Sequence, residues 1–212
     1  MKSRPAVAAV LSVVAILLLI SCSGTDRHAA VQGADTTTAR GVGDGPTSVE
    51  PGSADVATTV DPGTLPQTRD RPGTASAQFT AGVQAMWQGI VDDDPAAAMP
   101  FFFPLSAYRQ AKAEHDPTQD WNTRLVGAYT RDIRALHNQL GANANQATLV
   151  GLTVPDRAAI WVNPGQELNK LGYWRVYGST LRYSVGGRTL SMAIHSLISW
   201  RGEWYVVHVT HP

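Results

Sequence analysis

The chain has 212 residues, of which 17 are basic and 17 acidic, so its formal net charge at pH 7 is zero. This balance excludes the basic face that binds nucleic acid and the acidic tail of a solvating segment. With only one cysteine the chain has no internal disulfide, so its folded part must be held together by its own core.

The N-terminus has the three-part pattern of an export signal. Two basic residues precede an apolar run over residues 6–20, and Cys22 follows the small residue Ser21. This order predicts a secretory signal. An uncleaved membrane anchor needs about 20 apolar residues, more than the run provides. A plain signal without lipid would leave Cys22 as a free thiol on an exported protein, which is unusual in an oxidising compartment.

The stretch Leu19-Ile20-Ser21-Cys22 resembles the lipobox of bacterial lipoproteins. The resemblance implies that the signal peptide, residues 1–21, is removed and that the Cys22 thiol receives a diacylglyceryl group. It also implies that the new amine is acylated with a fatty acid such as palmitate. Two or more acyl chains give stable anchoring where one does not. The expected location is therefore the outer side of the cytoplasmic membrane. The excess of arginine over lysine is typical of a GC-rich genome, such as that of an actinobacterium.

Residues 22–77 carry the lipidated cysteine and a predicted disordered tether. The stretch contains no Phe, Trp or Tyr and consists mainly of small and polar residues. Such a composition buries too little apolar surface to offset the entropy of ordering. About 55 residues of flexible coil give a root-mean-square reach of roughly 40 Å. A chain that starts near Ser76 is expected to fold cooperatively without the tether.

Helical spacing dominates the first half of the remaining chain, residues 78–212. Apolar residues from Phe79 to Ile90 fall on one helix face, and Asp94 before Pro95 is typical of a helix cap. Pro100-Phe-Phe-Phe-Pro104 predicts a buried connector, because proline at both ends excludes a helix interior. After a short helix, a longer one is expected from Asp116 or Asp120 to Leu140, with Gly141 as its stop.

The second half has the alternation of strands. Five strands are expected, with tight turns at Gly186-Gly187 and Arg201-Gly202. Two-residue turns fix the register. They place Tyr183 opposite Leu190, Leu181 opposite Met192, Ile194 opposite Val209 and Ile198 opposite Tyr205. These residues form one apolar face, which the helices are expected to cover. The opposite face carries His195, Ser199, Trp204 and His208.

Three helical segments followed by an antiparallel meander, ending in Gly202-Glu203-Trp204-Tyr205-Val206-Val207-His208, resemble the NTF2-like family. The resemblance implies an α+β cone in which a curved sheet of about five strands wraps the long helix and can leave a pocket. Members of this family include enzymes, scaffolds and accessory subunits, so the fold does not give the function. No acid–base pair of the enzymatic members can be matched to positions in this chain.

Candidate sites are few. The chain lacks the motifs of serine hydrolases, zinc proteases and phosphate-binding loops, and no cofactor is expected. His195 and His208 face each other in the predicted register, which makes a metal contact conceivable, but no third ligand is evident. Tyr183, Met192 and Tyr205 lie on the apolar face, where they either line a ligand cavity or pack in the core.

The sequence therefore favours a lipid-anchored extracytoplasmic binding domain. We expect a non-enzymatic accessory partner of an envelope or membrane complex, attached to the membrane through the lipid on Cys22. The alternatives are a carrier that holds a small molecule or a lipid in the cone and, third, an NTF2-like enzyme. An apolar cavity of several hundred Å³ would favour the carrier, and a filled cone would favour the accessory partner.

The lipid anchor can be tested by replacing Cys22. Because the variant Cys22→Ala lacks the thiol that carries the diacylglyceryl group, we expect it to leave the membrane fraction or to accumulate as unprocessed precursor. Fractionation and intact-mass measurement will distinguish these states from the wild type. A variant that stays membrane-bound with the mass of the mature protein would contradict the lipobox interpretation.

Overall fold

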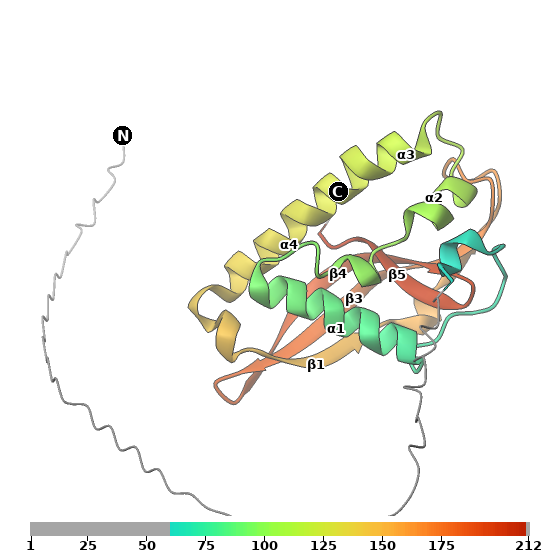
Figure 1. The fold of residues 1–212 in the computed structure, drawn as a ribbon. Helices are drawn as coiled ribbons and strands as arrows, with labels where there is room; N and C mark the ends of the chain where they lie inside the picture. Colours follow the sequence, from blue (N-terminus) through green and yellow to red (C-terminus); the bar gives the residue numbers. More distant parts are fainter. Residues whose placement is uncertain (1–59, 211–212) are drawn as a thin grey trace, which may run out of the picture. The chain divides into compact units, whose positions relative to one another are not determined.

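The structure is a computed structural model that describes residues 60–210. Helices from the first half of this range pack on an antiparallel sheet from the second half (Figure 1). The predicted α+β fold is confirmed. The predicted signal peptide, Cys22 and the tether up to residue 59 lie outside the described residues. No helix within residues 60–210 combines the length and the apolar character that crossing a membrane requires.

The first helix, α1 (Ala77–Asp92), forms where the apolar spacing predicts it. The Ser76 hydroxyl oxygen accepts a hydrogen bond of 3.0 Å from the Phe79 N–H, which satisfies a free donor of the first turn. Asp93, in the left-handed conformation with φ 55°, ends the helix. The predicted apolar face is buried in the core: Phe79, Val83, Met86, Trp87 and Ile90.

A connector bounded by prolines follows α1. Its phenylalanines Phe101–Phe103 are at most 2% exposed, as predicted. The Asp94 carboxylate accepts hydrogen bonds from the N–H groups of Ala96 and Ala97. Only the 3₁₀ turn η2 (Met99–Phe101) follows, so Asp94 caps a turn and not a helix. The Phe103 N–H donates to the Val206 carbonyl at 3.0 Å, so the connector covers the edge of the last strand.

The long predicted helix is present but is interrupted by a wider π turn. It begins after Asp116, whose carboxylate accepts a hydrogen bond from the N–H of Gln119, and it ends at Gly141, whose φ is 54°. Its apolar face is buried as predicted, with Trp121 at the margin. The helical segments after the connector are α2 (Leu105–Ala111), α3 (Pro117–Asp120), the π turn η3 (Trp121–Leu125) and α4 (Val126–Leu140).

The sheet has five antiparallel strands, in the order β1-β3-β4-β5, with β2 pairing along β3 beside β1. Both predicted two-residue turns are confirmed, since Gly186-Gly187 joins β3 to β4 and Arg201-Gly202 joins β4 to β5. All four turn residues have positive φ, which this type of hairpin requires. The strands are β1 (Thr148–Thr153), β2 (Ile160–Val162), β3 (Tyr173–Val185), β4 (Arg188–Trp200) and β5 (Glu203–His208).

The predicted register is correct over most of its length and fails near the end of β5. The pairs Tyr183–Leu190, Leu181–Met192 and Ile198–Tyr205 are confirmed. The predicted pairing of Ile194 with Val209 is wrong.

The error comes from a β-bulge at Val207. Leu197 pairs with Val206, but the next residue back, Ser196, pairs with His208, so Val207 has no partner of its own. A single extra residue moves all later side chains to the other face of the strand. The prediction that His208 points outward beside His195 is therefore also wrong, and His208 lies on the helix-covered side with Ser196.

Residues 62–74, which we call the strap, lie in the stretch whose composition predicts disorder, yet they pack against the sheet. The Gln67 side chain donates to the Ser199 carbonyl at 3.1 Å and accepts from the Arg201 N–H at 2.7 Å. The Trp200 indole N–H donates to the Pro62 carbonyl at 2.9 Å. Composition missed this order because the partners of the strap come from strands that lie more than 100 residues away in the chain.

Two arginines of the strap stack on tryptophans of the sheet. The Arg69 guanidinium lies 4.9 Å from the ring centre of Trp161, and that of Arg71 lies 4.6 Å from the ring of Trp174. At this end the sheet is covered on both faces. Ser199 and Trp204, which the register predicts to be exposed, are each 1% exposed.

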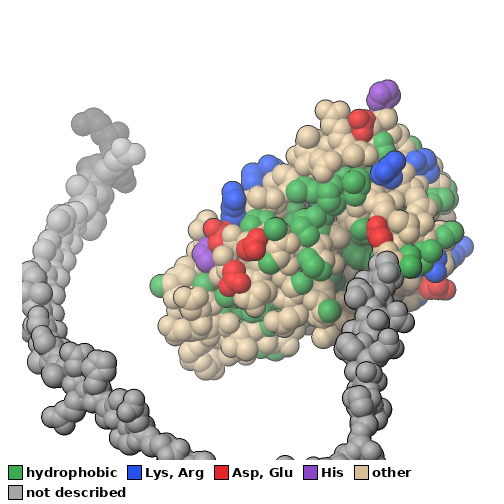
Figure 2. Space-filling model, viewed as in Figure 1, with side chains coloured by type: hydrophobic (Ala, Val, Ile, Leu, Met, Phe, Trp, Pro, Cys, Tyr) green, Lys and Arg blue, Asp and Glu red, His purple; other side chains and the backbone are tan. Residues whose placement is uncertain are grey.

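A shallow groove with mostly apolar walls lies beside the connector (Figure 2). We call it the apolar groove. Its volume is about 550 Å³, and its chief walls are Pro62, Met99, Phe102, Trp121 and Tyr205. It brings together residues of the connector, the π turn, β5 and the start of the strap.

The contribution of the strap to stability can be measured by truncation. A chain that starts at residue 75, which keeps the Ser76 cap of α1, should have an unfolding free energy lower by at least about 2 kcal/mol than a chain that starts at residue 60. The reason is that the buried Trp200 N–H and the Ser199 carbonyl lose their partners. Urea unfolding of the two chains tests this. Equal free energies would mean that the strap packs on the sheet without stabilising it.

Candidate functional site

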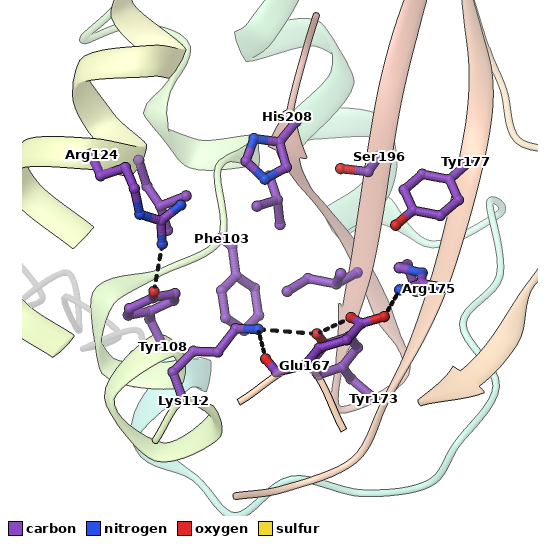
Figure 3. Close-up of a pocket in the computed structure, with 13 residues that line it drawn as sticks. Phe103, Tyr108, Lys112, Arg124, Glu167, Tyr173, Arg175, Tyr177, Ser196 and His208 are labelled. Atoms are coloured by element: carbon purple, nitrogen blue, oxygen red, sulfur yellow. Dashed lines mark hydrogen bonds and ion pairs between the residues drawn. The ribbon is translucent and has the colours of Figure 1, made fainter. Parts of the chain in front are cut away.

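A cavity of about 130 Å³ opens between the helices and the sheet, and we call it the charged pocket (Figure 3). One wall comes from α2 and the π turn, and the other from β3, β4 and β5. The polar groups of both walls point into the same space. Its lining residues are Phe103, Tyr108, Lys112, Arg124, Leu125, Glu167, Tyr173, Arg175, Tyr177, Ser196, Ile198, Val207 and His208.

The helical wall presents Arg124 through a network of hydrogen bonds. Its guanidinium forms an ion pair with Asp120, with Nε 2.7 Å from one carboxylate oxygen, and donates to the Tyr108 hydroxyl at 3.1 Å. Arg124 lies in the π turn, a feature that is often found at functional sites. The hydrogen bond from Arg124 lowers the pKa of Asp120, and the same bond raises the pKa of Arg124. Both groups therefore stay charged at neutral pH.

Tyr108 completes this network from α2. Its hydroxyl donates to the Asp120 carboxylate. Burial, followed by the hydrogen bond to Asp120, raises the pKa of Tyr108, so the hydroxyl keeps its proton over the whole physiological range. The network holds Arg124 at the pocket wall.

Lys112 follows the last residue of α2 and reaches the floor of the pocket. Its ammonium group donates to the Glu167 carbonyl at 3.1 Å and to the Tyr173 hydroxyl at 3.2 Å, and it lies 5.4 Å from the centre of the Tyr173 ring. Within residues 60–210 it forms no ion pair with a carboxylate. Burial, with Arg124 as a second cause, lowers the pKa of Lys112. The cation is therefore partly desolvated without a full counter-charge.

The sheet wall contributes Arg175, which is oriented by two neighbours. Its guanidinium pairs with the Glu167 carboxylate and lies 4.6 Å from the centre of the Tyr177 ring. The side chain is only 17% exposed, and its Nε is buried without a hydrogen-bond partner among the described residues. A buried donor of this kind is uncommon in folded proteins.

Glu167 sits on a loop in an unusual backbone conformation. Glu167 and Leu168 have φ values of 51° and 57°, a region that residues other than glycine seldom occupy. The Glu167 carboxylate also accepts a hydrogen bond of 3.2 Å from the Tyr173 hydroxyl. Such strained positions cluster at ligand sites, where the surrounding structure holds them in place.

The pocket has an excess of positive charge. Three cationic side chains, Lys112, Arg124 and Arg175, face one carboxylate, that of Glu167 (Figure 3). Asp120 lies behind Arg124 and offsets part of its charge. Even so, the positive charge near the cavity exceeds the negative, and a negatively charged guest is favoured there.

His208 lies at the end of the pocket opposite Glu167, next to Ser196 (Figure 3). The bulge at Val207 brings it there. Burial, followed by the charges of Arg124 and His195, lowers the pKa of His208, so it is neutral at pH 7.

The predicted site residues lie elsewhere. Tyr183 and Met192 are 5% and 2% exposed and line no part of the charged pocket. Tyr183 packs on Trp87, with ring centres 5.4 Å apart. Tyr205 packs on Phe103 and reaches the apolar groove. The structure therefore places Tyr183 and Met192 in the packed core, whereas Tyr205 both packs in the core and lines the apolar groove.

The two candidate metal ligands remain neighbours despite the bulge. The ring centres of His195 and His208 are 6.5 Å apart. Among residues 60–210, no group of three or more His, Cys, Asp or Glu side chains could hold a metal ion.

Sequence reasoning missed the charged residues of the pocket, although one signal was present. Arg175 lies an even number of residues from Leu181 and Tyr183 on β3, so it lies on the same face of the strand. That face was predicted to point inward. A cation at an inward position indicates a buried polar site. No comparable signal marks Lys112 or Glu167, which meet only through tertiary contacts.

Comparison of the chain with protein-family models, with curated proteins and with solved structures gives no significant match. The arrangement of the pocket itself therefore has to support any assignment of function.

The lowered pKa of His208 predicts a dependence of stability on pH. The groups that affect it are Arg124, His195, Asp132 and Lys112. Because the folded-state pKa lies below the unfolded value of about 6.5, the unfolded state binds more protons between these two values. The contribution of neutral His208 is complete above pH 6.5 and is lost as the pH falls towards the folded-state pKa.

Urea unfolding at pH 7.5 and at pH 5.5 tests this dependence. The wild type should lose more unfolding free energy between the two pH values than the variant His208→Gln, which has no imidazole to protonate. Equal losses in both proteins would show that His208 titrates normally.

Proposed function

We propose that this chain is a lipid-anchored, extracytoplasmic binding domain that holds a small ligand in the charged pocket. The observation that carries the proposal is the convergence of polar side chains from both walls on one open cavity. Four of these side chains are cationic or can become so, and the described residues leave Lys112 without a carboxylate partner.

The location in this proposal rests on the sequence. The lipobox resemblance at Cys22 supports attachment to the outer side of the cytoplasmic membrane. The order of helices and antiparallel strands is consistent with an NTF2-like cone, which we propose as the fold type.

A lipid carrier fits the pocket less well. Between the helices and the sheet, where such a cavity was expected, Tyr183 and Met192 are buried in the core, and the larger apolar groove of about 550 Å³ is a shallow surface feature beside the connector. The charged pocket, at about 130 Å³, lies below the roughly 300–1,000 Å³ typical of ligand clefts and is too small for an acyl chain.

An enzyme also fits less well. Glu167 is the carboxylate that lines the charged pocket, and it is already bonded to Arg175 and Tyr173. Figure 3 shows His208 at the other end of the cavity, so the two groups are not placed as an acid–base pair. Non-enzymatic binding is the simpler use of these side chains.

A second candidate function is favoured by the apolar groove. Its volume of about 550 Å³ and its apolar walls would suit a protein segment of an envelope or membrane complex (Figure 2). In that case the domain would act as an accessory partner and the charged pocket would be secondary.

The pocket proposal can be tested with compounds of up to about eight non-hydrogen atoms. We would measure the unfolding temperature of the wild type with neutral polyols such as glycerol, with amines and with acids in turn. At least one class should raise it, because a ligand that binds the native state stabilises it by mass action.

The matched variants are Ser196→Leu, which narrows the pocket, and Ser191→Leu, at an exposed site on the same strand. Ser196→Leu should abolish the ligand-induced rise in unfolding temperature, and Ser191→Leu should retain it. If no class raises the unfolding temperature of the wild type, the pocket proposal is wrong and the accessory-partner function takes precedence.

A further inference from the structure

We propose that the ligand of the charged pocket is a small oxyanion, a class that comprises short carboxylic acids and inorganic phosphate. This inference rests on the proposed function and narrows it to one chemical class. Lys112 and Arg175 bind the anion on the floor and the sheet side, and Arg124 adds positive charge from the helical side (Figure 3).

The hydrogen-bond donors of the pocket are only partly used. The Lys112 ammonium has three N–H groups and donates to two acceptors, the Glu167 carbonyl and the Tyr173 hydroxyl. The Arg175 guanidinium bonds to the Glu167 carboxylate through Nη1, and its Nη2 has no hydrogen-bond partner among the described residues. Oxygen atoms of a carboxylate or a phosphate are the acceptors that such charged donors bind most strongly.

The cations are held in place before a ligand arrives. Arg175 is fixed between the Glu167 carboxylate and the Tyr177 ring, and Lys112 lies over the Tyr173 ring. Rigid donors lose little conformational entropy when an anion binds, so the free energy of the new hydrogen bonds appears as affinity.

The size of the cavity limits the anion. A volume of about 130 Å³ lies below the roughly 300–1,000 Å³ of clefts that hold drug-sized ligands, so the part of the ligand inside the pocket is small. Phosphate and short carboxylic acids meet this limit, whereas nucleotides and fatty acids do not.

The charge of the pocket argues against other small molecules. An amine would be repelled by three neighbouring cations. A neutral polyol would displace water from Lys112 without supplying a counter-charge, which is unfavourable for a partly buried cation. An oxyanion both fills the cavity and compensates the charge.

The test is a titration of the full chain, purified in detergent, with sodium phosphate, sodium acetate and sodium succinate. The unfolding temperature and the heat of binding are measured at constant ionic strength, with chloride as the reference anion. At least one of the three anions should bind and raise the unfolding temperature, and chloride should not. Binding of phosphate alone, or of the carboxylates alone, supports the proposal and identifies the source of the oxyanion.

Two pocket variants and one control separate specific binding from general attraction. Lys112→Met and Arg175→Met should each weaken the anion at least about tenfold, since each removes a charged donor. Arg182→Met removes an exposed cation from the same strand as Arg175 and should change affinity less than about twofold. If Arg175→Met fails to fold, Arg175→Lys, which keeps the charge, is used in its place. It should also weaken binding, because a single ammonium group replaces the planar guanidinium, which can donate two parallel hydrogen bonds.

Two outcomes would overturn the inference, and they differ in what they leave standing. If polyols or amines raise the unfolding temperature and no oxyanion does, the ligand class is wrong while the binding function survives. If Arg182→Met weakens the anions as much as Arg175→Met, the anions bind by general surface charge, and the site is not the charged pocket.

Discussion

The charged pocket depends on one set of backbone contacts, those between the end of α2 and the loop before β3. The Ala113 N–H donates to the Leu168 carbonyl, and the Lys170 N–H donates to the Ala111 carbonyl, each at 2.7 Å. These bonds fix the loop in a conformation that places two residues in the left-handed region, at a cost on the order of 1 kcal/mol each. In return, the Glu167 carboxylate is placed against Arg175 and its carbonyl against Lys112. Without this contact the Glu167 loop would not connect the helical wall to the sheet wall.

Grouping three cations in a partly buried space is unfavourable, and the fold offsets the repulsion one residue at a time. Asp120 compensates Arg124, Glu167 compensates Arg175, and the Tyr173 ring and hydroxyl partly stabilise Lys112. The compensation is incomplete at Lys112, because its partners carry no full negative charge. A bound anion would supply the negative charge that Lys112 lacks. The same uncompensated charge that lowers the stability of the fold would therefore make the site selective for anions.

The strap changes how the domain is joined to the rest of the chain. Its hydrogen bonds run to Ser199, Trp200 and Arg201, around the last hairpin of the sheet. That hairpin carries β5, which contributes Val207 and His208 to the pocket. Strap, hairpin and pocket are therefore parts of one packed structure, although the strap itself has a composition of low hydrophobicity. An anchor at Cys22, as proposed, would be joined to the domain through this element.

The sequence by itself determined the features that depend on neighbours along the chain. Apolar spacing gave α1 and the long helix, the paired prolines gave the buried connector, and glycines at positive φ gave both hairpins and the end of α4. Only the tertiary structure decided the bulge at Val207, the packing of the strap on the sheet and the charged pocket. The physical reason is the same in each case. A bulge, a docked strap and a cluster of charges are stabilised by partners far away in the sequence, and no local periodicity records which distant partner a residue meets.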